Sequence, residues 1–107
     1  GFSISGLYDL RILTKISSIN KDLRMSDTDA AMLSPALMPS PQGARLSIAV
    51  GGKELGGFKD QHRLIAQSWS SSIGLDVPCP MDNHFSILET FADPNSELFG
   101  AAMQMFE

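Results

Sequence analysis

The sequence has a single cysteine, no long apolar run and no visible targeting segment. With only Cys79, the chain cannot form an internal disulfide, which fits a reducing compartment and predicts a cytoplasmic protein. We expect this cysteine to be a small packed residue rather than a reactive thiol. No uncharged apolar stretch approaches the roughly 20 residues that a membrane-spanning helix needs. No basic segment followed by an apolar one marks a signal peptide. The sequence therefore argues against a disulfide-stabilised domain and a membrane partner.

Positive charge is also scarce. Eight Lys and Arg stand against twelve Asp and Glu, a net charge of −4, and the basic residues are scattered along the chain. A nucleic-acid-binding face needs clustered basic residues because it neutralises phosphates, so no nucleic-acid partner is expected. The two histidines, His62 and His84, are not spaced with cysteine or acid partners as in a zinc site. The sequence thus predicts no metal site.

The composition is that of one small globular domain. The chain has 107 residues, of which 43% are apolar and 19% charged, enough for a single modest core. Apolar patterning predicts strands near 2–6, 46–50 and 75–78. A helix with a loop is expected over 11–25, and further helices near 26–34, 58–72, 84–91 and 96–106.

Local signals predict where several of these helices begin and end. Ser26 stands three residues before Asp29, an acidic variant of the capping pattern, and Ser96 is the predicted N-cap of the last helix. Gly74 is the predicted C-cap of the helix over 58–72.

Strands that alternate with helices predict an α/β fold. The connections imply right-handed crossovers and a three-layer arrangement, a parallel sheet with helices on its faces. Three strands make a thin sheet with both edges unpaired. We therefore expect residues 1–107 to be one flank of a larger sheet.

Two residues stand where chemistry is expected in such a sheet. Working residues of parallel α/β sheets collect in loops at the carboxyl ends of strands. Glu54 follows the second predicted strand and His84 the third. A carboxylate in one loop can hold an imidazole from the next, fixing its tautomer and stabilising the imidazolium. Spacing alone leaves the alternatives open: a solvated Glu54 and a His84 that merely begins a helix.

Several motifs together resemble a known family. In chain order they are ISGLYDL (4–10), LSP (33–35), VGGKE (50–54), Gln61 with His62, and NHFSILE (83–89). They resemble the last three strands of an α/β-hydrolase, and in particular the kynurenine formamidase (arylformamidase) branch with related carboxylesterases. The resemblance covers nearly the whole chain, and NHFSILE is its most specific part. It implies a partial α/β-hydrolase fold.

The resemblance gives two residues catalytic roles. Glu54 corresponds to the acid of a catalytic triad and His84 to its general base, with Asn83 and Phe85 flanking the histidine. Many members of the family carry Asp at the acid position, although Glu also serves in this superfamily. No metal or organic cofactor is implied.

Other positions are expected to be structural or to depart from the family. Tyr8 and Asp9 match the YDL motif, where we expect a buried phenol and a turn or cap. Gly56 and Gly57 replace bulkier residues after the acid, which predicts a looser loop. His62 is expected to be a surface residue.

The nucleophile elbow G-x-S-x-G occurs nowhere in the 107 residues, and no oxyanion-hole motif is present. Because the superfamily order is nucleophile, acid, histidine, the resemblance implies that both parts lie upstream of Gly1. The start without Met agrees with this. We expect the chain to be the carboxyl-terminal part of a serine hydrolase domain.

Two functions follow. In the first, the parent enzyme hydrolyses an N-formyl amide, such as N-formylkynurenine, or a small ester, and the partners of this chain are that substrate and the missing amino-terminal portion. In the second, the chain is a non-catalytic remnant that serves as an interaction domain. In both, the unpaired sheet edges favour self-association.

Overall fold

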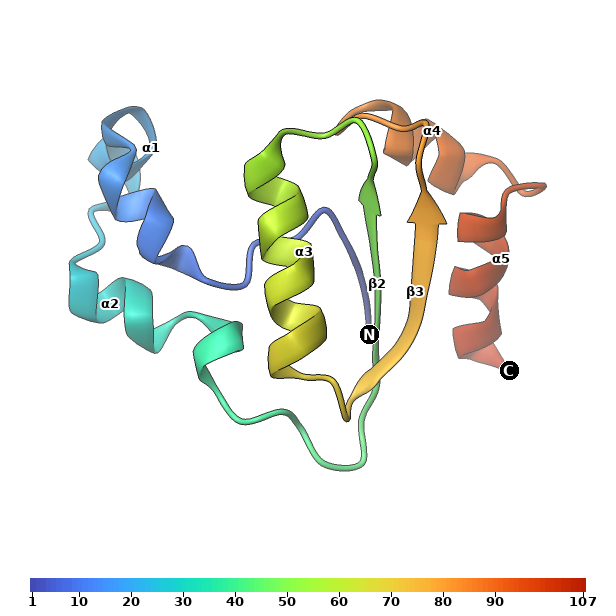
Figure 1. The fold of residues 1–107 in the computed structure, drawn as a ribbon, viewed down its shortest axis with the longest axis horizontal. Coiled ribbons are helices and arrows are strands. Elements are labelled where there is room, and N and C mark those ends of the chain that lie inside the picture. The colour runs from blue at the N-terminus through green and yellow to red at the C-terminus, as the bar shows by residue number, and fades with distance from the viewer.

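The computed structural model describes residues 1–107 and contains a parallel sheet with helices on both faces (Figure 1). The strands are β1 (Phe2–Ile4), β2 (Leu46–Gly51) and β3 (Ile73–Cys79), in the spatial order β1-β2-β3. Both neighbouring pairs are parallel. The predicted α/β fold with a three-stranded parallel sheet is confirmed.

The chain also has five α-helices. They are α1 (Ser17–Leu23), α2 (Asp27–Met32), α3 (Gly56–Ser68), α4 (Ser86–Ala92) and α5 (Glu97–Met103). Short 3-10 helices cover Leu10–Lys15, Pro35–Leu37 and Gln104–Phe106. In Figure 1, α3 lies on one side of the sheet and α5 on the other. None of the helices combines the length and the apolar composition that a membrane span requires.

The core has two parts because side chains alternate along β2. Ile48 faces one way, where it packs with Ile65 of α3. Ala49 faces the other way, into a cluster that includes Ile87 of α4 and Leu98 of α5. All five side chains are fully or almost fully buried. The middle strand is thus covered on both faces, as a parallel sheet requires.

The predicted caps are confirmed at two helices and wrong at a third. Ser26 and Asp29 form a reciprocal capping box on α2, and Ser96 accepts from the Phe99 N–H on α5. Gly74, however, lies in β3, because α3 ends earlier and the chain turns back over 69–72. A Cβ at this glycine would lie 3.0 Å from Ser47 Oγ on the neighbouring strand, so space between strands accounts for it.

Tyr8 and Asp9 have the expected structural positions. The Tyr8 side chain is buried, and its hydroxyl lies 2.7 Å from Ser3 Oγ. The Asp9 carboxylate accepts from the Arg11 N–H and caps the 3-10 helix that follows.

Two expectations about the segment after Glu54 are wrong. Gly56 and Gly57 are the first residues of α3 rather than part of a looser loop. His62 is not a surface residue, since its side chain is only 13% exposed. Its Nε2 lies 2.9 Å from Asp76 Oδ1, so it links α3 to β3. The sequence did not reveal this contact, because the carboxylate partner of His62 lies on β3, 14 residues further along the chain.

Candidate active site

Glu54 and His84 meet at the carboxyl end of the sheet. Glu54 Oε1 lies 2.7 Å from His84 Nδ1, a charge-assisted hydrogen-bond distance. The Glu54 side chain is completely buried, whereas the imidazole is 45% exposed. The imidazole is therefore anchored through Nδ1, and its Nε2 forms no hydrogen bond within the chain. This arrangement leaves Nε2 able to exchange a proton with a group outside the chain.

The second carboxylate oxygen of Glu54 is also fully engaged. Oε2 accepts from Ser5 Oγ at 2.6 Å and from the Gly51 N–H at 2.5 Å. Burial disfavours the charged form, but the hydrogen bonds from Ser5, Gly51 and His84 outweigh it and hold the pKa of Glu54 below its ordinary value. The carboxylate is thus kept ionised and acts only as an acceptor.

Backbone hydrogen bonds hold the two loops together. The Gly52 N–H donates to Cys79 O and the Lys53 N–H to Asp82 O, both at 2.9 Å. Glycine is needed here, because a Cβ at Gly51 would lie 2.3 Å from Asp82 O. The double glycine therefore allows the close approach that brings Glu54 to His84.

We predict that Gly51→Ala destabilises the fold and disturbs the site. Backbone must move away from the new methyl group, at a cost of about 1–3 kcal/mol. The matched control is Gly100→Ala in α5, where a Cβ meets nothing within 4 Å and the helix gains up to about 1 kcal/mol. Urea unfolding of both variants measures the difference. Equal stabilities for Gly51→Ala and the parent chain would contradict the proposed steric requirement.

Aromatic and polar neighbours orient the imidazole. The Phe58 ring stacks on His84 with centroids 4.4 Å apart, and the Phe85 ring meets it edge-on at 5.6 Å. Asn83 Oδ1 accepts from the N–H groups of Phe85 and Ser86, both at 2.8 Å, and so closes the turn that starts α4. Asn83 and Phe85 thus flank the histidine, as predicted.

An apolar cavity of about 380 Å³ lies beside Phe58 at the start of α3. Leu7, Ile12, Ile16 and Leu55 line it, together with Phe58, whose ring also stacks on His84. Its walls come from the segment after β1 and the start of α3. Phe58 thus belongs both to this cavity and to the surroundings of His84, and the cavity offers an apolar surface to a bound group.

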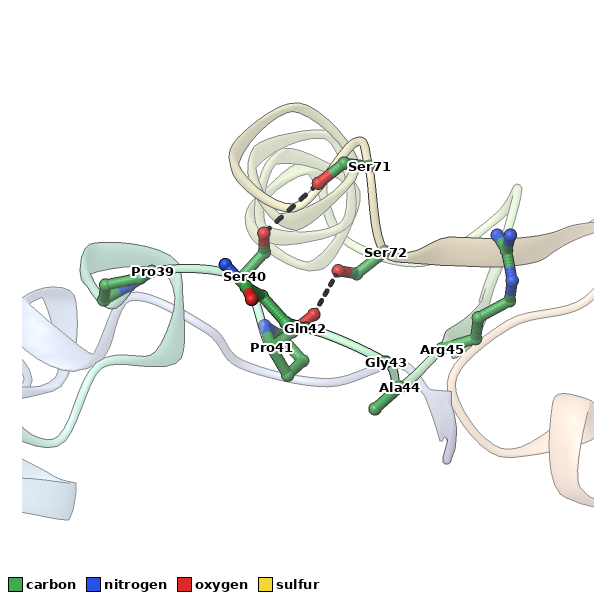
Figure 2. A pocket seen from close by; sticks show the side chains of 9 residues that line it. All are labelled: Pro39, Ser40, Pro41, Gln42, Gly43, Ala44, Arg45, Ser71 and Ser72. Atoms are coloured by element: carbon green, nitrogen blue, oxygen red, sulfur yellow. Dashed lines mark hydrogen bonds between the residues drawn. The ribbon is translucent and has the colours of Figure 1, made fainter.

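A polar hollow at the other end of the sheet has no connection with this pair. It lies between residues 39–45, which lead into β2, and the turn before β3 (Figure 2). Ser40 and Ser71 are joined through their hydroxyls, and Ser72 Oγ donates to Pro41 O at 2.8 Å. These bonds tie the proline-rich segment to the sheet, which is a structural role.

The other chemically active side chains do not gather into a second site. No three His, Cys, Asp or Glu residues are grouped as metal ligands would be. Cys79 is buried, as predicted. Its pKa is raised, mainly by burial and further by the negative charges of Asp82, Glu97 and Glu54. His62 lies with Asp76 and not with Glu54.

Comparison with known proteins gives one informative match. No protein-family model matches the chain, and no curated protein matches it. Residues covering 91% of the chain superpose on a solved protein from Silicibacter sp. TM1040 that is described as a candidate thioesterase, with 33% identity and a TM-score of 0.79. The chain spans only 36% of that protein. The fold described above is therefore that of one part of a larger α/β chain, and the chain resembles part of a candidate thioesterase.

Proposed function

We propose that this chain supplies the acid and the histidine of a serine hydrolase of the α/β-hydrolase type, as its carboxyl-terminal part. The observation that carries the proposal is the 2.7 Å hydrogen bond between buried Glu54 and the exposed imidazole of His84. The likeness to part of a candidate thioesterase supports it, because thioester hydrolysis is also acyl transfer to water. The nucleophilic serine then belongs to a segment joined to the amino-terminal side of this chain.

The proposed mechanism uses the two nitrogens of His84 for different tasks. Nε2 takes the proton from the serine hydroxyl as the oxygen attacks the substrate carbonyl, and the imidazolium is stabilised by Glu54 at Nδ1. Nε2 then gives the proton to the leaving amine, alcohol or thiol. Water repeats the sequence, releasing the acid and restoring the serine. Glu54 stays ionised throughout, in agreement with its lowered pKa.

The substrate we favour is an N-formyl amide on an aromatic amine, as in the kynurenine formamidase branch, or a small ester. The apolar cavity lined by Phe58, whose ring stacks on His84, supports an aromatic or aliphatic group next to the reacting carbonyl. A thioester substrate has the same apolar requirement, and the solved relative favours it. The reaction we propose needs no metal or organic cofactor, and the single buried cysteine fits a cytoplasmic location.

The test compares the chain alone with the chain joined to a nucleophile-bearing segment. We expect residues 1–107 to hydrolyse N-formylkynurenine, p-nitrophenyl acetate and a short acyl thioester no faster than free imidazole does. The joined protein should hydrolyse at least one of the three. Hydrolysis by the chain alone would contradict the proposal, and so would failure of a folded joined protein with all three substrates.

A second candidate function is self-association without catalysis. Leu55, Phe85 and Phe106 are 78, 79 and 85% exposed, and both edge strands are unpaired in the chain. Large exposed apolar side chains and open sheet edges favour association. We expect the isolated chain to form dimers or larger species in sedimentation velocity at high concentration. A clean monomer that also fails to bind an apolar dye would contradict this prediction.

A further inference from the structure

Ser5 has an unusual backbone conformation for its residue type. Its φ is +51°, in the left-handed region that few residues other than glycine adopt. The Ser5 N–H still donates to Ala49 O at 2.8 Å, so the residue stands at the point where β1 leaves the sheet. A serine in a conformation that favours glycine indicates that its side chain is required there.

A glycine does occur next to Ser5, at position 6, but it serves a different purpose. Gly6 has no positive φ. A glycine is required there because a Cβ would lie 2.5 Å from the Tyr8 hydroxyl and 2.6 Å from Ser3 Oγ. Glycine is thus used for the close approach at position 6, whereas serine is kept at position 5 despite its backbone conformation.

The Ser5 hydroxyl reaches Glu54 on the neighbouring strand end. Its 2.6 Å hydrogen bond goes to Oε2, the oxygen that does not contact His84. The Gly51 N–H binds the same oxygen but belongs to the end of β2, the strand that leads directly into Glu54. Ser5 is therefore the one donor to this oxygen that belongs to a different strand, and it restrains the carboxylate plane from across the sheet.

We propose that Ser5 is a positioning residue, which fixes the Glu54 carboxylate so that Oε1 points at His84 Nδ1. The catalytic importance of Ser5 rests on the proposed function, whereas the orientation of the Glu54 carboxylate by Ser5 can be tested in this chain alone. His84 is the ionisable group that contacts Glu54, and the charge of Glu54 also reaches Cys79, beside Asp82 and Glu97. The effect of Ser5 on Glu54 can thus be followed by titration.

The test uses two variants of the chain, Ser5→Ala and Ser5→Gly. Glycine removes the hydroxyl and also relaxes the left-handed backbone, so a folded protein is expected even if Ser5→Ala is unstable. Carboxyl ¹³C NMR should show a raised pKa of Glu54 in both variants, because a hydrogen bond to its charged form is lost. Imidazole ¹⁵N shifts should show a smaller share of the tautomer with the proton on Nδ1.

Arg24→Gly is the matched control. Arg24 has nearly the same φ, +52°, and ends α1 away from the sheet. It should leave the Glu54 titration and the His84 tautomer unchanged. An unchanged Glu54 pKa in folded Ser5→Gly would overturn the inference.

In the joined hydrolase, Ser5→Gly should lower kcat about tenfold with KM nearly unchanged, since one hydrogen bond to a charged group is lost. A changed KM with an unchanged kcat would also overturn the positioning role. If His84→Ala left hydrolysis intact while Ser5→Gly raised the pKa of Glu54, the proposed function would fail and the orientation by Ser5 would stand.

Discussion

In the joined hydrolase, His84→Ala is expected to lower kcat by about 10⁴-fold or more, with a small change in KM. In the proposed mechanism, this substitution removes both the acceptor for the serine proton and the donor for the leaving group. His84 is 45% exposed, so the fold should tolerate the change, and circular dichroism checks that it does. Steady-state hydrolysis of the best substrate from the panel above gives the rate.

His62→Ala is the control for this experiment. His62 is the second histidine of the chain, but it binds Asp76 of β3, and its Nδ1 is buried without a partner. Its loss should lower stability and leave kcat per folded molecule close to the parent value. If His84→Ala kept near-parental activity, or if His62→Ala lost as much as His84→Ala, the assignment of the base would be wrong.

Glu54→Gln is expected to lower kcat by about 10³- to 10⁴-fold through the tautomer of His84. The Gly51 N–H is a fixed donor to Oε2, so the amide oxygen must take that position and the NH₂ group must face Nδ1. Nδ1 then has to accept, which moves the proton of the neutral imidazole to Nε2. An imidazole protonated at Nε2 cannot take a proton from serine.

Two measurements separate this effect from a general loss of structure. Imidazole ¹⁵N shifts of the variant should report the proton on Nε2, whereas the parent chain should carry it on Nδ1. Glu54→Ala should cost somewhat less than Glu54→Gln, because the imidazole is poorly oriented but is not forced into the wrong tautomer. A variant with the parental tautomer and a large loss of kcat would contradict this explanation.

The sequence predicted the parts of the fold that depend on local patterns. Apolar patterning predicted the bounds of β2 and β3 to within a few residues. Ser26 with Asp29 correctly indicated the start of α2. The end of α3 could not be predicted from Gly74, because this glycine lies in β3. It is explained by the close approach of Ser47 on the neighbouring strand and not by a helix end. Tertiary contacts decided this position.

The candidate site was also predicted only in part. Parallel strands bring their carboxyl-end loops together, so the approach of Glu54 and His84 followed from topology, and the structure places them 2.7 Å apart. The contribution of Ser5 was missed, although it lies near the carboxyl end of the first predicted strand, at the same edge of the sheet. Serine is common in turns, and its left-handed backbone was not visible in the sequence.

The most direct test of the acid–histidine pair is covalent labelling of the joined hydrolase with an alkyl fluorophosphonate, followed by mass spectrometry. The reagent reacts with a serine only when a base removes its proton, and it needs no assumption about the natural substrate. We predict one phosphonyl adduct on a serine outside residues 1–107, formed quickly in the parent and in His62→Ala. The adduct should be almost absent in His84→Ala and slow in Glu54→Gln. Equal labelling rates for the parent and His84→Ala would contradict the proposal that His84, held by Glu54, is the base of a serine hydrolase.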